Sequence, residues 1–298
     1  MVEPTIKIHK LSKKYSSRRE YALKNLDLKV YPGEVYGFLG PNGAGKSTTI
    51  RLLLNFIRPT SGSASILGLD IVKDSVKLKR SIGYLSGDVS LYGRMNGNQL
   101  LEYMRELTPV KNKAYLKELI NTYQAQLDKP INQLSKGNRQ KIGLIQAFMH
   151  EPEILILDEP TSGLDPLMQA TFFQYVREVK SKGVSVFLSS HDLSEVQKMC
   201  DRVGFIRDGK LIAEQKIANL IENASHTFDV TFSGPVPTDI FKSPYFTFET
   251  TGPNSLMIHV KGELSPLFKV LANYKVVSLD RREVSLEQEF MHFYEREK

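Results

Sequence analysis

A glycine-rich stretch near residue 40 has the residue types and the spacing of a phosphate-binding loop. It reads Gly40, Pro41, Asn42, Gly43, Ala44, Gly45, Lys46, Ser47 and Thr48. Glycines allow the tight turn in which backbone N–H groups point inward, and the N-terminus of a following helix attracts anions. Lys46 can then reach the β- and γ-phosphate oxygens, and the Ser47 hydroxyl can ligate Mg²⁺. Thr48 is placed to add another donor.

The segments on either side of this loop have the patterns of a strand and a helix. Residues 35–39 form an apolar run typical of a buried strand, and we expect the helix to begin at about Gly45. Apolar residues then recur at i, i+3, i+4 and i+7, which gives the helix one face that can pack against a sheet. These residues are Ile50, Leu53, Leu54 and Ile57. The alternative, an ordinary glycine-rich turn, does not require this strand–loop–helix context.

Polar residues follow two further apolar strands. Residues 154–157 precede Asp158 and Glu159, and residues 184–188 precede two serines and His191. Continuous apolar runs of this length are typical of buried parallel strands, whose carboxyl ends meet at one ligand crevice. We therefore expect these carboxylates and His191 to lie at the same edge of the sheet as the phosphate-binding loop.

The rest of the first 222 residues adds smaller layers to this sheet. Alternating apolar residues over the first thirty positions predict a small antiparallel β layer. Helical periodicity over about residues 97–150 predicts an inserted helical subdomain, in which Ser135 is placed to cap a helix. Outside this subdomain, Asp165 is placed to cap the helix that begins at Pro166. Asp208 and Gly209, flanked by strand candidates at residues 203–207 and 210–214, predict a hairpin. The predicted fold class is α/β, a P-loop NTPase with a mostly parallel sheet.

The pattern changes near residue 222, where we place a domain boundary. Residues 1–222 form the first domain, and residues 223–298 a small α+β domain with alternating strands and a last helix. The apolar face of that helix consists of Leu286, Phe290, Phe293 and Tyr294. The histidines of this domain are isolated, so we expect surface or hydrogen-bonded side chains rather than a metal site. They are His226, His259 and His292.

Length and composition are those of a globular protein without a membrane span. The chain has 298 residues, of which 41% are hydrophobic and 24% charged. No apolar run approaches the roughly 20 residues of a transmembrane helix and the N-terminus lacks a signal peptide, so we expect a cytosolic chain. The single cysteine, Cys200, excludes an intrachain disulfide and is expected to be a buried apolar residue. We interpret the net charge of +7 as a solvated basic face; an anionic membrane surface and nucleic acid are the alternatives.

Five motifs in one order resemble the ATP-binding subunit of ATP-binding cassette (ABC) transporters. They are the phosphate loop, a signature segment from Leu134 to Asn138, the pair Asp158 and Glu159, the loop Ser162, Gly163, Leu164 and Asp165, and finally His191. The resemblance covers about residues 5–222. It implies an ATPase whose ligands are ATP and Mg²⁺.

The resemblance implies a role for each matching residue. Residues 40–48 correspond to the phosphate loop, and Tyr15 to an aromatic residue that stacks on adenine. Asp158 corresponds to the carboxylate that holds Mg²⁺ through water. Glu159 corresponds to the general base that orients the attacking water, and His191 to a histidine that contacts both the γ-phosphate and that water. Phosphoryl transfer requires positioning and charge neutralisation more than covalent chemistry, so these residue types suffice.

The resemblance also implies a second ATP-binding subunit. In this family the signature segment of one subunit covers the γ-phosphate bound in the other, with a serine hydroxyl and a helix N-terminus as donors. Ser135 and Gly137 occupy these positions here. Asp165 corresponds to an aspartate that connects the two sites across the interface. Two subunits thus hold two ATP molecules, and a homodimer is the simpler expectation.

Two regions depart from the family pattern. The usual signature is Leu-Ser-Gly-Gly-Gln, but Lys136 and Asn138 stand at its third and fifth positions. Lys136 either adds positive charge beside the γ-phosphate or points to solvent. After the strand at residues 82–85 the family places a glutamine that binds Mg²⁺ and senses the membrane partner. Gly87 stands there instead, and Asp88 either replaces the glutamine at the metal or only forms a turn.

A chain of this family without a membrane span requires a separate integral-membrane permease. We expect it to dock at the cytoplasmic side of the cell membrane through residues 87–95, where Leu91, Tyr92 and Met95 would form an apolar groove. The signature, the loop at Gly87 and Asp88 and the small C-terminal domain are similar to those of the branch that exports drugs, bacteriocins and antibiotics.

The alternative function is a non-transport ABC ATPase that acts on ribosomes, DNA or an assembly pathway. The single uninterrupted cassette without sustained heptads argues against this alternative. We therefore expect no nucleic-acid partner.

Overall fold

The structure of the chain is a computed structural model that describes residues 2–16, 20–89, 91–108, 112–224, 227–236, 245–260 and 263–281. The chain divides into two units, residues 1–215 and 216–298. The boundary expected after residue 222 lies inside α8 (Ile217–Ala224), a helix of the second unit. The expected last helix, with Leu286, Phe290, Phe293 and Tyr294, lies outside the described residues, as do His226 and His292.

A six-stranded sheet in the order β10-β9-β3-β8-β7-β6 forms the centre of the first unit. Its strands are β3 (Val35–Leu39), β6 (Ile82–Leu85), β7 (Ile154–Asp158), β8 (Ser185–Ser190), β9 (Arg202–Arg207) and β10 (Lys210–Lys216). Strand β3 pairs in parallel with β8 and β9, and β7 pairs in parallel with β6 and β8. The mostly parallel sheet is therefore confirmed. Asp208 and Gly209, both with positive φ, form the turn between β9 and β10, as predicted.

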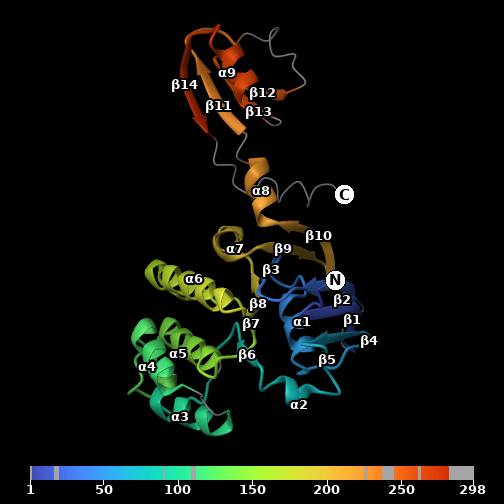
Figure 1. Ribbon diagram of the computed structural model, residues 1–298, viewed down its shortest axis with the longest axis vertical. Coiled ribbons are helices and arrows are strands. Elements are labelled where there is room, and N and C mark those ends of the chain that lie inside the picture. The colour runs from blue at the N-terminus through green and yellow to red at the C-terminus, as the bar shows by residue number, and fades with distance from the viewer. Residues whose placement is uncertain are drawn as a thin grey trace. The chain divides into compact units, whose positions relative to one another are not determined.

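A second sheet confirms the antiparallel layer expected near the N-terminus. Its order is β2-β1-β4-β5, and the adjacent strands run antiparallel. The strands are β1 (Ile6–Lys14), β2 (Tyr21–Val30), β4 (Ser61–Ile66) and β5 (Leu69–Asp70). Helix α1 (Lys46–Leu53) lies beside this layer in Figure 1. One hydrophobic core joins Ile6 of the layer, Ile50 of α1 and Phe187 of the central sheet, so the helix after the glycine-rich loop is fixed from two sides.

The inserted region between β6 and β7 is helical, as expected. It contains α3 (Gly97–Leu107), α4 (Lys113–Tyr123), the 3₁₀ turn η1 (Ile131–Gln133) and α5 (Lys136–Phe148), which Figure 1 shows in green. Helix α6 (Pro166–Ser181) follows β7, and a short α2 (Ser75–Leu78) precedes β6. Ser135 caps α5 and Asp165 caps α6, because each side chain accepts a hydrogen bond from the backbone N–H three residues later. Both predicted caps are thus confirmed.

Helix α7 (Leu193–Met199) packs closely against β3. A Cβ atom added to Gly37 would lie 2.8 Å from Val196 Cγ1 and 3.0 Å from Cys200 Sγ, so a glycine in β3 is what permits this approach. Cys200 is buried, as predicted, and burial raises the pKa of its thiol well above the usual value. The thiol is therefore kept in its unreactive protonated form. None of the helices in the described ranges is both long and apolar enough to cross a bilayer.

The second unit is an α+β structure, as expected. Besides α8 it contains β11 (Thr227–Phe232), β12 (Phe246–Gly252), β13 (Ser255–Val260), α9 (Ser265–Leu271) and β14 (Val276–Arg281). The strands form an antiparallel sheet in the order β12-β13-β11-β14, and its apolar side chains share a core with Leu267 and Leu271 of α9. His259 Nδ1 lies 2.9 Å from Thr227 Oγ1, so this histidine is hydrogen-bonded within the sheet.

Candidate active site

The glycine-rich loop connects β3 to α1 and depends on its glycines. Gly43 and Gly45 have φ values of +83° and +115°, in the region that disfavours side chains. A Cβ atom on Gly45 would lie 2.8 Å from Ala22 O, and one on Gly40 would lie 2.3 Å from Ile206 O. Larger residues would therefore displace backbone at both positions. The loop ends at the first residue of α1, so the free N–H groups of that helix face the space that the loop encloses.

The Lys46 ammonium lies inside this loop and is only 6% exposed. Its Nζ atom donates to Gly40 O at 2.6 Å and to Pro41 O at 3.3 Å. It also lies 3.3 Å from Glu159 Oε1. A buried ammonium needs such partners, because removing it from water without them costs several kcal/mol. Phosphate oxygens could replace these two carbonyls as hydrogen-bond acceptors of the Lys46 ammonium.

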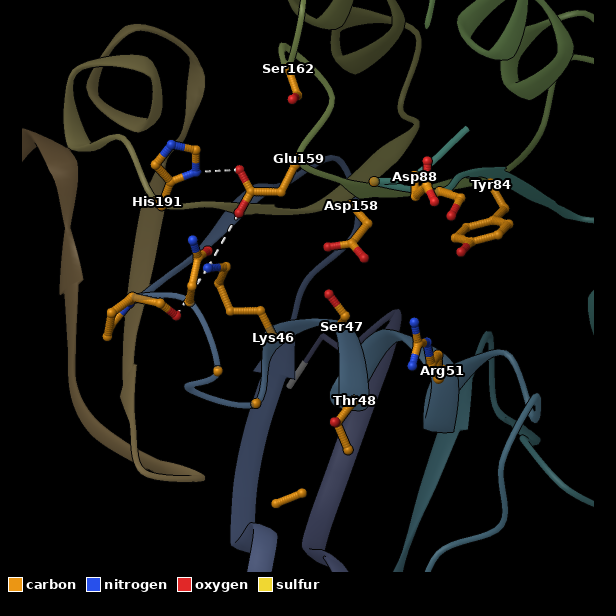
Figure 2. A pocket seen from close by; sticks show the side chains of 17 residues that line it. Lys46, Ser47, Thr48, Arg51, Tyr84, Asp88, Asp158, Glu159, Ser162 and His191 are labelled. Carbon is orange, nitrogen blue, oxygen red and sulfur yellow. Dashed lines mark hydrogen bonds and ion pairs between the residues drawn. The ribbon is translucent and has the colours of Figure 1, made fainter. Parts of the chain in front are cut away.

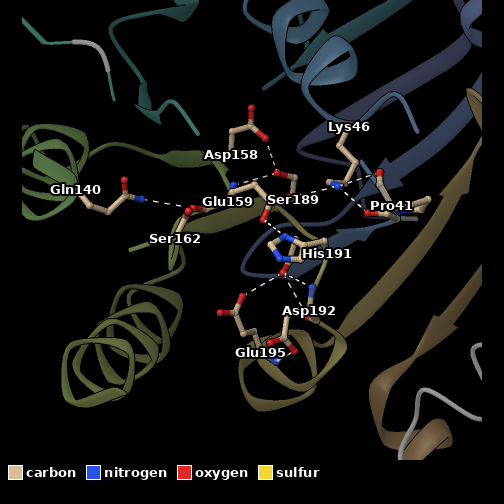
Figure 3. Close-up of polar contacts among 12 residues, drawn as sticks. Pro41, Lys46, Gln140, Asp158, Glu159, Ser162, Ser189, His191, Asp192 and Glu195 are labelled. Atoms are coloured by element: carbon tan, nitrogen blue, oxygen red, sulfur yellow. Dashed lines mark hydrogen bonds and ion pairs between the residues drawn. The ribbon is translucent and has the colours of Figure 1, made fainter. Parts of the chain in front are cut away.

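The acidic pair and the histidine converge on the same place from two neighbouring strands (Figure 3). Asp158 ends β7, and its Oδ1 atom accepts a hydrogen bond from Ser189 Oγ at 2.5 Å. Glu159 follows with φ of +49°, and its Oε2 atom accepts a hydrogen bond from His191 Nδ1 at 2.6 Å. Glu159 is thus held between an imidazole and the Lys46 ammonium, as Figure 2 shows.

These groups line one cavity of about 520 Å³. Eleven of the residues assigned from the sequence contribute to its wall: Pro41, Asn42, Gly43, Gly45, Lys46, Ser47, Thr48, Asp88, Asp158, Glu159 and His191. Gly40 and Ala44 belong to the same loop but are not part of the lining. Tyr15, Ser135, Gly137 and Asp165 are also outside it. The structure therefore brings together the phosphate loop, the acidic pair and the histidine, and it separates the signature segment from them.

The oxygen donors of the cavity suit a magnesium ion. The Ser47 hydroxyl and the Asp158 carboxylate face each other across the cavity in Figure 2. Mg²⁺ prefers oxygen ligands and is usually held by one or two carboxylates together with substrate phosphates. These two side chains, next to a phosphate-binding loop, fit that requirement.

Gly87 and Asp88 lie where the family glutamine was expected. Both line the cavity, and the Asp88 side chain is exposed. A Cβ atom on Gly87 would lie 3.3 Å from Asp158 O and 3.4 Å from Asp158 Oδ2, so a side chain there would crowd the carboxylate. Asp88, which follows Gly87, and Asp158 therefore both line the cavity.

Several side chains of the site were not assigned from the sequence. Ala22, Arg51, Tyr84, Ser86 and Ser162 also line the cavity. Arg51 lies four residues after Ser47 on α1, so helical periodicity could have indicated it. Burial raises the pKa of Tyr84, which stays protonated beside the cavity. Ser189 could be placed at this edge of the sheet from the sequence, but its bond to Asp158 could not.

The signature segment forms the start of α5 and contacts its own chain. Ser135 Oγ accepts a hydrogen bond from Asn138 N at 3.2 Å. The Asn138 side chain does not complete a capping box, because its Oδ1 atom accepts from Gln126 N at 3.0 Å. Lys136 Nζ donates to Ser162 Oγ at 2.8 Å, and the Lys136 stem packs against Gly163. The lysine therefore bridges the signature segment to the loop that follows the acidic pair.

Tyr15 lies just after β1, and its ring is half-buried. The Lys13 ammonium lies 5.3 Å from the centre of the ring. This contact accounts for the position of Tyr15 without a ligand. Its assignment to adenine stacking stays a prediction.

Comparisons with known proteins agree with the geometry of the site. Residues 23–162 match the family model described as ABC transporter. The chain is 36% identical over 212 residues to the bacitracin transport ATP-binding protein BcrA of Bacillus licheniformis, an alignment that covers 70% of this chain and 69% of BcrA. It is 37% identical over 216 residues to YbhF of Escherichia coli (strain K12), named a probable multidrug ABC transporter ATP-binding protein. That alignment covers 71% of this chain but only 37% of YbhF, so the chain spans little more than a third of that relative.

A solved structure shows the same fold. It is an ATP binding subunit of an ABC transporter, with a TM-score of 0.67 and 27% sequence identity. The superposition covers 73% of this chain and 92% of that one. The family match, the relatives and the fold agree with the site built above, and the chain belongs to the family of ABC transporter ATP-binding proteins.

Proposed function

We propose that this chain binds Mg²⁺ and ATP in the cavity, pairs with a second copy around the nucleotide, hydrolyses it and thereby powers a separate membrane permease. One observation carries the proposal: the phosphate loop, Asp158, Glu159 and His191 line a single cavity. Membership of the ABC ATPase family supports ATP as the ligand.

The contacts of Lys46 and Glu159 indicate how the site works. When phosphate oxygens become the partners of the Lys46 ammonium, Glu159 loses its contact with Lys46 and keeps its contact with His191. Its carboxylate can then accept a proton from a water molecule whose oxygen bonds to the γ-phosphorus, while the bond to the β-phosphate oxygen breaks. Ser47 and Asp158 would hold Mg²⁺, which neutralises phosphate charge when bound.

The place of the signature segment supports pairing of two subunits. Ser135 and Asp165 are exposed and lie outside the chain's own cavity. Ser135 is at the N-terminus of the 13-residue helix α5, where free N–H groups favour an anion. A nucleotide held by a second copy supplies that anion. The simplest assembly that uses both features is a symmetric dimer with two nucleotides.

The relatives support a transport role of the export type. BcrA is named for bacitracin transport and YbhF for multidrug transport. We infer that the permease partner exports drugs, peptides or antibiotics and that this chain works at the cytoplasmic side of the membrane. Tyr92 lies in the loop that we assign to permease docking. It is 55% exposed, and its ring packs edge-on against Tyr103.

Replacing the base should trap the dimer. In Glu159→Gln the amide cannot accept the proton from water, so ATP should bind and persist, and the chain should change from monomer to dimer on addition of ATP. Size-exclusion chromatography with light scattering measures this change. Glu159→Gln combined with Ser135→Glu is the matched control, since a carboxylate at the start of α5 should repel the γ-phosphate held by the second copy and keep the chain monomeric. An ATP-bound Glu159→Gln chain that stays monomeric would contradict the homodimer.

Docking through Tyr92 predicts a change in cell fractionation. The wild-type chain should sediment with membranes, and Tyr92→Asp should shift most of it to the supernatant, because a carboxylate is costly to bury in an apolar groove. Tyr245→Asp is the control, since Tyr245 is also 55% exposed but lies in the other unit. A wild-type chain that leaves the membranes and follows ribosomes or DNA would support the non-transport alternative instead.

A role of Asp88 at the metal predicts a change in magnesium dependence. Asp88→Ala should raise the Mg²⁺ concentration at half-maximal ATPase activity about tenfold, as the loss of a supporting metal contact typically does. Asp27→Ala, which removes a carboxylate bound to His9 outside the cavity, should leave it unchanged. Unchanged dependence in Asp88→Ala would leave Asp88 with the turn-forming role alone.

A further inference from the structure

Glu159 has a backbone conformation that its surroundings must maintain. Its φ of +49° is in the left-handed region, which costs a residue with a side chain about 1 kcal/mol or more. This conformation turns the chain sharply after β7 and directs the carboxylate between His191 and Lys46. Groups that hold the backbone of Glu159 therefore also determine where the carboxylate lies.

The backbone around Glu159 is held from two sides (Figure 3). On the N-terminal side, Glu159 N donates to Ser189 Oγ at 3.0 Å. On the C-terminal side, Gln140 Nε2 donates to Pro160 O at 2.8 Å and lies 3.4 Å from Glu159 O. The first contact comes from β8, next to β7 in the sheet. The second comes from α5, which is distant in sequence and begins at the signature segment.

Gln140 is an unusual residue at its position in α5. It is 1% exposed, and the buried side chains that follow it on this helix, Ile142, Leu144 and Ile145, are apolar. Burying an amide without a hydrogen bond costs about 2 kcal/mol or more, so the bond to the Pro160 carbonyl compensates its burial. Gln140 does not line the cavity. Any effect of this side chain on hydrolysis must therefore pass through the loop that it holds.

We propose that Gln140 is a positioning residue for Glu159. By fixing the carbonyls of Glu159 and Pro160, its amide keeps the carboxylate turned into the cavity at the place of the attacking water. The proposal rests on the proposed function, because it assumes that Glu159 is the base. The Lys136–Ser162 hydrogen bond supports it, since this bond joins α5 to the same loop a few residues further on, at a serine that lines the cavity.

Gln140→Met tests the proposal, because methionine keeps the length and burial of the side chain but cannot donate. We expect the kcat of ATP hydrolysis to fall about tenfold or more, as displacement of a catalytic group typically produces, while ATP affinity and melting temperature stay close to wild type. Gln146→Met is the matched control on the same helix. The buried Gln146 Oε1 atom has no hydrogen-bond partner among the residues that the structure describes, so its replacement should leave kcat unchanged.

A double mutant separates positioning from a general structural role. If Gln140 acts through Glu159, Gln140→Met should lower the residual rate of Glu159→Gln no further. An equal loss in both backgrounds would overturn the proposal, as would a wild-type kcat in Gln140→Met or a fall in ATP affinity and melting temperature that matches the fall in kcat. Should Gln140→Met not fold, Gln140→Asn, which withdraws the amide by one methylene, gives the same comparison.

Failure of the proposed function is distinguishable from failure of this inference. A wild-type chain that does not hydrolyse ATP contradicts the proposed function, and the positioning role with it. If the wild-type chain hydrolyses ATP and Gln140→Met hydrolyses it at the same rate, only the positioning role is contradicted.

Discussion

The buried charge of Lys46 is the constraint on which the rest of the site depends. An ammonium with 6% exposure must have partners, and here it has two loop carbonyls and the Glu159 carboxylate. The glycines of the loop bring the carbonyls close enough, and β7 brings the carboxylate. A ligand that carries negative charge into the loop could replace these partners of the ammonium and free the carboxylate.

The central sheet explains why residues more than a hundred positions apart meet at this lysine. Leu39 of β3 pairs with Ser190 of β8, and Asp158 of β7 pairs with Ser189 of the same strand. Three parallel strands therefore end side by side, and the residues that follow them share one edge. The antiparallel layer and α1 share a core with this sheet, which fixes the helix that carries Lys46 and Ser47.

Most of the fold and the centre of the site could be predicted from local pattern. The apolar strands, the glycine spacing and the polar residues at strand ends are patterns of neighbouring positions. The carboxyl ends of parallel strands in one sheet lie at the same edge, so the residues that follow these strands can be expected to meet. Gln140 could not be found this way, because its role is a contact between an inserted helix and a distant loop. The hydrogen bond from Lys136 to Ser162 depends on tertiary packing for the same reason. Tyr15 has the residue type for stacking and lies beside Lys13, and its assignment to adenine stays a prediction.

The most direct test of this account is the affinity of the chain for ATP in the presence of Mg²⁺, measured by isothermal titration calorimetry for wild type and Lys46→Met. We expect the substitution to weaken binding about thirtyfold, which corresponds to about 2 kcal/mol for a lost hydrogen bond to a charged group. Lys182→Met, which removes an ammonium bound to Glu178 outside the cavity, should bind as wild type does. Equal affinity of Lys46→Met and wild type would contradict the assignment of this cavity to the nucleotide.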